Sequence, residues 1–461
     1  IYLIRDKSGI KPLYYSFYKN GIVFSSEIKP ILQIIDNKDI NEKAILNHIT
    51  FLFNFNDETA FKNVYKLKPA HILEFSERGY NIYQYWDYKF SNNIESLILA
   101  KKEFIETFDK VIKSQLISDT EVSVFLSGGI DSSLISLFAS KYKNLKAFSL
   151  IYPQKYQKNE IIKDEFYYAL EIAKKLNFEI EAIEFDLNED LLDKFVYYIE
   201  EPVGDVAGIS TYLMCDYNKS RVVLSGMGGD ELFGGYPRYK AYSIYKKFHF
   251  LQINKIPFPN YFKKLSRDIE KFKRVWGKPY YYYLSYFNDI ELKRLAKTDY
   301  NPFHKAQEIY EKIEGNYYEK MLIFDFKTFL PHHNLLYSDK LSMAKSVELR
   351  VPFLDDRILE LSRKLNYKLK VDKLLIKSVL NEYFPKITKR KKMGFGGPIR
   401  SWIFKNEKFI SNEIKYLKRL DFLNFKEIEN ILNFQFKGKR FLDLNVFELL
   451  VISRWLKIFR I

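Results

Sequence analysis

The sequence has little cysteine and no long apolar run. One of its 461 residues is cysteine, Cys215, so an intramolecular disulfide is excluded and a reducing compartment is indicated. No apolar stretch reaches the roughly 18 residues that a membrane-spanning helix needs, and no signal peptide is recognisable. We therefore expect a cytoplasmic protein without a membrane partner. The sequence begins at Ile1, without a methionine and within a strand pattern, so we expect it to lack an N-terminal part.

Long tracts of one charge are also missing, although the chain is basic. The formal net charge is +16, from 74 lysines and arginines against 58 aspartates and glutamates. Such a charge suits nucleic acid, an acidic membrane or small anionic substrates. The basic residues are scattered among Ile, Asn, Tyr and Phe and form no long tract beyond Lys389 to Lys392. This scatter is typical of a compositionally biased genome, and we expect no nucleic-acid partner.

Length and periodicity predict two domains. A chain of 461 residues is too long for one ordinary core. In residues 1–90, short strands alternate with Gly and Asn turns, which predicts a mostly antiparallel layer with a helix or two. After a polar boundary at 91–101, apolar strands are expected near 122–126, 147–151, 179–185 and 221–224, with helices between them. This α/β succession predicts a doubly wound parallel sheet, with further helices added after it.

The first candidate site is the loop that follows the predicted strand 122–126. Gly128 and Gly129 let backbone N–H groups approach an anion at the start of the next helix. Asp131 stands among these groups, and a carboxylate beside phosphates requires a cation between them, so the loop indicates Mg²⁺. Hydroxyl groups come from Ser127, Ser132 and Ser133. The loop has no lysine and therefore differs from the phosphate loop of kinases. The alternative is a plain Gly-Ser turn between strand and helix.

A second loop of the same kind leaves the predicted strand 221–224. It reads Ser225-Gly-Met-Gly-Gly-Asp-Glu-Leu-Phe-Gly-Gly-Tyr236, and Asp230 and Glu231 supply carboxylates for a cation or for orientation. For Glu231 the alternative is a structural acceptor that bonds backbone N–H groups. Because parallel strands end at one edge of a sheet, two such loops predict a shared ligand crevice.

These motifs resemble those of the glutamine-dependent asparagine synthetases, and the resemblance covers nearly the whole chain. The first loop is similar to the pyrophosphate loop of enzymes that cut ATP between its α- and β-phosphates. Further matches are Arg5-Asp-x-x-Gly-Ile-Lys-Pro-Leu-Tyr-Tyr, Ser346-Val-Glu-x-Arg-Val-Pro-Phe-Leu-Asp and Arg390-Lys-Lys-x-Gly-Phe. The resemblance implies that 1–90 is the C-terminal part of a class II, N-terminal-nucleophile glutaminase domain. It implies that 100–461 is the ATP-pyrophosphatase, or synthetase, domain.

The resemblance also implies roles for single residues. Asp131 and Asp230 would hold Mg²⁺ on the pyrophosphate, and Lys392 would reach the α-phosphate, where adenylation concentrates negative charge. For Lys392 the alternative is a solvated basic turn. The expected ATP-binding residues are Leu126, Ser127, Gly128, Gly129, Asp131, Ser132, Ser133, Leu150, Ser225 and Gly226. With Phe148, Leu126 and Leu150 are candidates for the adenine pocket, and simple core packing is the alternative.

Several residues are candidates for the acceptor end of the cleft. Glu348, with Ser346 and Arg350, is expected to serve it as a catalytic residue; alternatively, Glu348 and Arg350 form a buried ion pair that holds two helices. Asp205 lies near substrate or caps a helix. The sequence departs from the family at Met227, where relatives usually carry Glu or Asp. His332 and His333 stand where relatives tend to be acidic, and Tyr337 where many have lysine.

The predicted activity is that of an ATP-dependent ligase. Aspartate would attack the α-phosphate to give β-aspartyl-AMP and pyrophosphate, and ammonia from glutamine would then displace AMP to form asparagine. The glutaminase nucleophile is not found in the sequence. An alternative acceptor is a sugar acid or another carboxylate, as in polysaccharide biosynthesis, and a more distant alternative is a non-catalytic nucleotide-binding module. The expected partners are aspartate, glutamine or ammonia, and ATP. A homodimer is compatible with this interpretation.

Overall fold

A five-stranded parallel sheet organises the larger part of the chain. In the computed structural model, which describes residues 1–153, 166–251, 272–390 and 396–461, this sheet has the strand order β11-β10-β7-β8-β9. The strands are β7 (Val122–Phe125), β8 (Lys146–Ile151), β9 (Glu179–Glu184), β10 (Val222–Leu224) and β11 (Glu348–Arg350), and all of their pairings are parallel. The predicted doubly wound sheet is confirmed.

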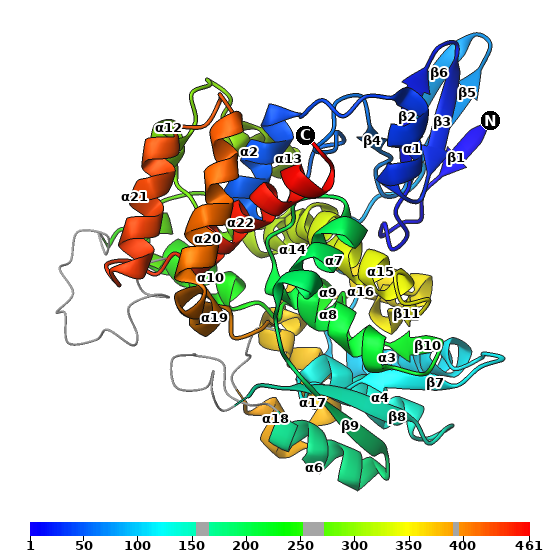
Figure 1. Cartoon of the computed structure of the whole chain (residues 1–461). Helices are drawn as coiled ribbons and strands as arrows, with labels where there is room; N and C mark the ends of the chain where they lie inside the picture. The colour runs from blue at the N-terminus through cyan, green and yellow to red at the C-terminus, as the bar shows by residue number, and fades with distance from the viewer. Residues whose placement is uncertain (154–165, 252–271, 391–395) are drawn as a thin grey trace.

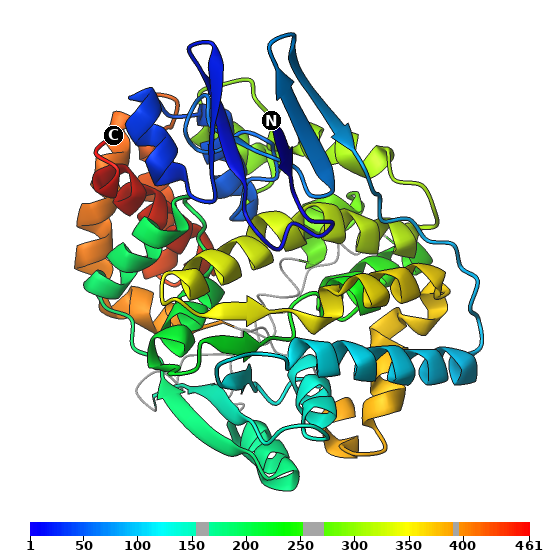
Figure 2. The same ribbon diagram turned by 90° about the vertical axis from the view of Figure 1, so that its right-hand side faces the viewer.

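Helices cover both faces of this sheet, as a doubly wound fold requires. On one face, α4 and α6 contact the strands, and α3 and α17 pack beside α4; on the other face, α8 contacts β8 and β9, and α15 contacts β11 (Figure 2). The helices are α3 (Leu97–Gln115), α4 (Ile130–Ala139), α6 (Phe166–Leu176), α7 (Glu189–Ile199), α8 (Val206–Tyr217), α15 (Leu335–Met343), α16 (Asp356–Lys364) and α17 (Leu374–Leu380). The central strands β7 and β10 are wholly buried, so their largely apolar runs follow from burial on two faces.

The N-terminal segment, residues 1–90, forms two small antiparallel sheets and two helices, as its alternating pattern predicted. One sheet contains β1 (Tyr2–Ile4), β5 (His71–Ser76) and β6 (Gly79–Gln84). The other contains β3 (Gly21–Ser25), β2 (Tyr14–Tyr18) and β4 (Tyr65–Lys66), and the helices are α1 (Ile28–Ile35) and α2 (Glu42–Phe51). Both views place these strands at the opposite end of the molecule from the parallel sheet, with α15 between them (Figures 1 and 2).

Additional helices complete the larger part of the chain. The aromatic run at 280–283 is a 3₁₀ turn, η3 (Tyr280–Leu284), packed in the core. The remaining elements are α9 (Gly229–Phe233), α10 (Pro237–Phe248), α12 (Asp289–Leu295), α13 (Pro302–Glu311), α14 (Tyr317–Lys327), η4 (Leu330–Asn334), α18 (Pro385–Thr388), α19 (Ile399–Lys405), α20 (Glu407–Ile414), α21 (Phe425–Phe436) and α22 (Asp443–Ile458). Among the described residues, no helix is both long and apolar enough to span a membrane.

Candidate active site

The two glycine-rich loops leave neighbouring strands of the parallel sheet. β7 pairs with β8 on one side and with β10 on the other, so the chain order reverses between β7 and β10. The first loop follows β7 and the second follows β10, which places both at this reversal, on the carboxyl edge of the sheet. Ligands of doubly wound sheets bind in the crevice at such a position. The expectation that the two loops share one crevice is therefore met by the topology.

The first loop closes on itself through its serines. Gly129 N donates to Ser127 Oγ at 3.3 Å, and Ser133 Oγ donates to the carbonyl of Gly129 at 2.5 Å. Ser132 Oγ lies 3.2 Å from Ser127 Oγ and also donates to Gly129 O. Asp131 lies in the first turn of α4, where the N-terminal N–H groups of the helix are available to an anion. The loop therefore has the form of an anion cradle.

Asp131 and Asp230 converge from the two loops on one buried cation. Lys373 Nζ lies 2.5 Å from Asp131 Oδ1 and 2.6 Å from Asp230 Oδ1. The Lys373 side chain is 4% exposed, and those of Asp131 and Asp230 are 17% and 14% exposed. The loops also touch, since a Cβ on Gly229 would lie 2.5 Å from Asp131 Oδ1. The structure thus brings together the two aspartates that the sequence singled out, and adds a lysine that the sequence analysis missed.

This pair of aspartates fits a magnesium ion bound with a nucleotide. Both carboxylates contact the same ammonium, so both lie within reach of one small cation. Mg²⁺ usually takes one or two carboxylates, and substrate phosphates and water complete its octahedron. In the part of the chain that the structure describes, no group of three or more His, Cys, Asp and Glu residues forms a metal site by itself. An ion held by Asp131 and Asp230 would therefore depend on phosphate oxygens for its remaining ligands.

A hydrogen-bonded network lies beside the second loop, at the same edge of the sheet. Glu231 is buried and accepts bonds from Tyr236 Oη at 2.6 Å and from Asn334 Nδ2 at 2.9 Å. Burial raises the pKa of Glu231, although the bond from Tyr236 opposes this shift. These bonds fit the alternative role of Glu231 as a structural acceptor. The donors are the side chains of Tyr236 and Asn334, whereas backbone N–H groups were expected.

The same network reaches Asp205 through a histidine. The Asn334 amide nitrogen serves Glu231 and Tyr236, so Asn334 Oδ1 accepts the bond from His333 Nδ1 at 2.9 Å. His333 Nε2 then lies 3.2 Å from Asp205 Oδ2. Asp205 also caps α8 through Ala207 N at 2.9 Å. The helix-cap alternative for Asp205 is therefore correct, and its second oxygen has a buried partner.

Behind Asp205 lies a second acid. Glu448, on α22, is fully buried, and a Cβ on Gly204 would lie 1.9 Å from its Oε2. Burial raises the pKa of Glu448 well above its usual range, and the charge of Asp205 raises it further. Both effects favour the protonated, neutral form of Glu448.

Met227 lies against this group rather than in the phosphate cradle. Its Sδ accepts a weak bond from Ser338 Oγ at 3.7 Å, and the side chain is half-buried. Ser338 and Tyr337 belong to α15, and Tyr337 Oη is 3.5 Å from Asn334 Oδ1. The departures from the family at Met227, His333 and Tyr337 therefore gather on one side of the crevice.

Glu348 is not brought together with the loop residues. The sequence was expected to place it at the acceptor end, or in a buried ion pair between two helices. The structure places it at the start of β11, an edge strand, where its half-exposed carboxylate is paired with Arg350 at 3.0 Å. Arg350 also donates to the carbonyls of Gln115 and Ile117, which precede β7. The ion pair exists, but both of its residues lie on β11, and Arg350 connects this strand to the segment that precedes β7.

The other predicted residues are placed as follows. Leu126 is buried directly after β7, and Phe148 and Leu150 are buried within β8. Ser225 and Gly226 begin the second loop, and Ser225 N donates to Arg350 O at 2.9 Å. Lys392 lies outside the described residues. Arg390, which opens the same basic segment, donates to the carbonyl of Gly128 at 3.0 Å, so the described start of that segment contacts the first loop.

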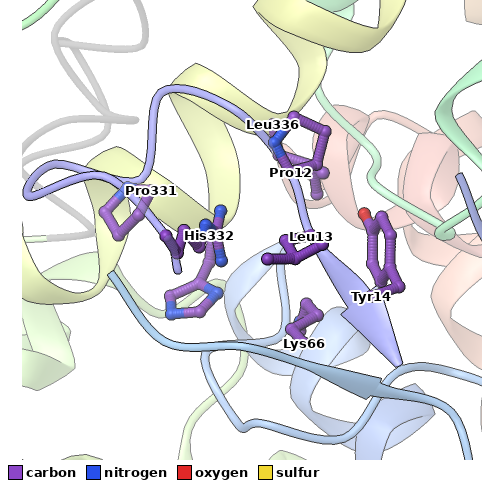
Figure 3. Close-up of a pocket in the computed structure, with 8 residues that line it drawn as sticks. Pro12, Leu13, Tyr14, Lys66, Pro331, His332 and Leu336 are labelled. Atoms are coloured by element: carbon purple, nitrogen blue, oxygen red, sulfur yellow. The ribbon is translucent and has the colours of Figure 1, made fainter. Parts of the chain in front are cut away.

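A separate pocket lies where the N-terminal segment meets η4 and α15. Figure 3 shows His332 beside Pro331, with Tyr14 across from them; none of the lining residues comes from the glycine-rich loops. Burial lowers the pKa of His332 well below its usual value, and nearby Lys66 and Arg5 lower it further, so the imidazole is neutral. This pocket belongs to the contact between the N-terminal segment and the rest of the chain.

Comparison with known proteins agrees with this geometry. The asparagine synthase family matches residues 103–457, and the glutamine amidotransferase domain family matches residues 1–86. Asparagine synthetase [glutamine-hydrolyzing] 1 of Bacillus subtilis is 30% identical over 437 residues, which cover 88% of this chain and 67% of that protein. A putative asparagine synthetase of Methanocaldococcus jannaschii is 34% identical over 256 residues, 51% of this chain and 47% of its own length.

A more distant relative carries another name. Amidase chry2 of Gibberella zeae is 24% identical over 458 residues, which cover 86% of this chain and 67% of that protein. The chain thus spans two thirds or less of the length of these three relatives. The family match nevertheless extends over most of the chain and includes both glycine-rich loops and the strands that carry them. The chain belongs to the asparagine synthase family.

Proposed function

We propose that this chain amidates a carboxylic acid at the expense of ATP, with aspartate as the acceptor and asparagine as the product. The observation that carries the proposal is the convergence of Asp131 and Asp230, from two glycine-rich loops on neighbouring strands, within contact distance of one buried ammonium. Such an arrangement suits the pyrophosphate end of a nucleotide. The match to a glutamine amidotransferase domain over residues 1–86 supports glutamine as the source of ammonia. We further propose a division into a glutaminase part, 1–90, and a synthetase part, 100–461.

Different residues of the crevice have different roles in the first step, the adenylation of the acceptor. The acceptor carboxylate attacks the α-phosphorus and pyrophosphate leaves, so negative charge increases on the departing oxygens. The cradle of Ser127, Gly129 and Ser132 holds these oxygens through N–H and O–H groups, and Asp131 and Asp230 would hold Mg²⁺. When bound, that ion would neutralise pyrophosphate charge as a Lewis acid. Lys392, from the sequence, is the proposed cation at the α-phosphate.

In the second step, ammonia attacks the acyl carbon, AMP leaves and the nitrogen loses a proton. The group at this side of the crevice contains Met227, Asp205 and His333. The structure gives no support to Glu348 as the base, because its carboxylate is paired with Arg350, which also bonds the segment before β7. Asp205 is the carboxylate on this side of the crevice. Its side chain is oriented by His333 and by the N-terminus of α8, which it caps.

The same group of residues favours a second candidate function. Met227, His333 and Tyr337 replace residues that are usually charged in this family, so an acceptor other than aspartate, such as a sugar acid, would meet a different pocket. The likeness to a fungal amidase also supports a broader range of reactions for this fold. This alternative keeps ATP cleavage and changes the carboxylate.

Pyrophosphate release tests both candidates. We expect release from ATP to require Mg²⁺ and a suitable carboxylate, with aspartate and a panel of sugar acids compared in the presence of ammonium. Asp131→Asn and Asp230→Asn should each lower release by ~10²-fold or more, because metal assistance is worth several kcal/mol. Asp109→Asn is the matched control, since Asp109 pairs with Lys141 at 2.9 Å on the outer surface of α3. Near-normal release by both crevice variants would refute the proposal.

A further inference from the structure

Lys373 contacts both crevice aspartates, and the sequence analysis did not single it out. It ends the 3₁₀ turn η7 (Val371–Lys373) and immediately precedes α17. Its ammonium bonds to both oxygens of Asp131 and to Asp230 Oδ1. In the described part of the chain, the two carboxylates therefore share this ammonium.

The backbone and a glycine hold Lys373 in this place. Lys373 has φ +56° and the preceding Asp372 has φ +54°, a left-handed conformation that side chains other than glycine seldom adopt. A Cβ on Gly235 would lie 2.2 Å from Lys373 Cε and 1.9 Å from Asp230 Oδ1, so only glycine leaves room for this pair. Two successive residues with unfavourable backbone angles, and a glycine that alone leaves room for the ion pair, indicate that the fold holds Lys373 beside the aspartates.

The charges of the three groups determine what the site attracts. Asp131, Asp230 and Lys373 together carry one negative charge, which does not favour phosphate. A divalent cation held by both aspartates would stand beside the Lys373 ammonium, and the like charges repel each other strongly where side chains are buried. The combined set would then carry one positive charge, which attracts pyrophosphate. Without Lys373 the same set would be neutral.

We propose that Lys373 is a resident counter-ion that makes metal binding depend on phosphate. It weakens the affinity of the aspartate pair for a divalent cation alone, and it contributes a charge-assisted bond when cation and pyrophosphate bind together. This inference rests on the proposed function, because it takes Asp131 and Asp230 as the metal ligands. It makes Lys373 a binding residue for the pyrophosphate end of the nucleotide, and it couples metal entry to nucleotide entry.

Binding of Mn²⁺, followed by electron paramagnetic resonance, tests the proposal without turnover. Titrations use Mn²⁺ alone, and Mn²⁺ with inorganic pyrophosphate, on the full chain. Lys373→Met should bind Mn²⁺ alone about tenfold or more tightly than the wild type, because a like charge has been removed. The same variant should bind pyrophosphate with Mn²⁺ about tenfold or more weakly, because a charge-assisted bond has been lost. Lys373→Arg, which keeps the charge, should retain weak binding of Mn²⁺ alone.

Lys377→Met is the matched control. Lys377 lies one turn along α17 and pairs with Asp372 at 2.7 Å on the surface, so its loss should change neither affinity. If Lys373→Met leaves both affinities unchanged while Asp131→Asn abolishes metal binding, the counter-ion proposal is wrong and the metal site stands. If Asp131→Asn and Asp230→Asn leave metal binding intact, the proposed function itself fails. Thermal melting of each variant establishes that it is folded, and Lys373→Arg provides the comparison if Lys373→Met melts early.

Discussion

Glu201 offers a quantitative test of how the N-terminal segment is attached to the synthetase part. It is fully buried after α7, and its carboxylate meets three groups of the N-terminal segment. It accepts from Ala60 N at 3.1 Å, lies 3.1 Å from His48 Nε2 and is 3.7 Å from Lys66 Nζ. Burial by itself raises the pKa of Glu201, but Lys66 and His48 lower it by more, so the pKa lies below its usual value. The carboxylate is therefore charged at neutral pH.

The change Glu201→Gln keeps the shape and removes the charge. Lys66 is 4% exposed, and its ammonium would then be buried without a charged partner. Removing one partner of a buried ion pair costs about 3–5 kcal/mol. The control is Asp356→Asn, which breaks the bridge from Lys7 to Asp356 at 2.8 Å between the same two parts of the chain. That pair lies at the surface and should cost less than about 1 kcal/mol.

Hydrogen exchange measures the loss of stability in each part of the chain separately. A local measurement is needed because a chain of this size is not expected to unfold in one two-state step. Peptides that cover α2 and residues 59–67 should exchange ~10²- to 10⁴-fold faster in Glu201→Gln, since 1.4 kcal/mol is a factor of ten. Adding Lys66→Met to Glu201→Gln should recover about 0.5–3 kcal/mol of the summed losses, because the two residues are coupled. Equal exchange rates in Glu201→Gln and Asp356→Asn would refute this reasoning.

The same pair predicts a pH dependence with a definite sign. A carboxyl group whose pKa is lowered in the folded state stabilises that state above its unfolded pKa, about 4.3 for glutamate. This contribution is lost as the pH falls through the lowered folded pKa. The advantage of the wild type over Glu201→Gln should therefore be constant near neutrality and should shrink below pH about 4. An advantage that grows on acidification would contradict the assignment of Glu201 as an ionised carboxylate.

Three further predictions concern the crevice and the core. Glu348→Gln should leave pyrophosphate release within about twofold of the wild type, because Glu348 pairs with Arg350 away from the loops; a loss of ~10²-fold or more would restore it as a catalytic residue. Met227→Glu should raise the amide formed per pyrophosphate released with aspartate, up to the ~10²- to 10⁴-fold of general-base assistance, and no gain would show that a carboxylate there is irrelevant. Cys215 should resist a thiol reagent at pH 8 until the protein unfolds, because burial raises its pKa to about 12, and rapid labelling of the folded chain would contradict this.

The sheet and its loops were predictable because local signals specify them. Val122–Phe125 and Val222–Leu224 are buried on both faces, so their residues are apolar apart from Ser123, and glycine-rich loops follow both strands. Strand order follows from the reversal of a doubly wound sheet, which places the two loops side by side. The convergence of Asp131 and Asp230 is a consequence of that topology and needs no further information.

The remaining parts of the site depend on contacts between distant residues. β11 has three residues and begins with Glu348, so no run of apolar residues marks it as a strand. Lys373 follows an unremarkable Val-Asp pair, and its role arises only when α17 packs against α4, 242 residues away in sequence from Asp131. The pairing of His333 with Asp205 likewise joins two helices whose spacing the sequence does not record. Lys392 stays a prediction, since it lies outside the described residues.

The segment formed by η4 and α15 connects the N-terminal segment to the crevice. On one side, Asp339 pairs with Lys11 at 2.6 Å, and Lys340 pairs with the buried Glu200 and lies over the Tyr14 ring. On the other side, Asn334 and Ser338 contact Glu231 and Met227 of the second loop.

The first turn of this segment, Leu330–Asn334, is a π-helix, a form that is common at functional sites. His332 faces the pocket between the N-terminal segment and α15, whereas the adjacent His333 faces Asp205. Packed elements of this kind move as units, because a close-packed interior transmits displacement rather than absorbing it. A shift of the N-terminal segment would therefore be carried by α15 to the residues around Met227, on the side of the crevice where we propose that ammonia reacts.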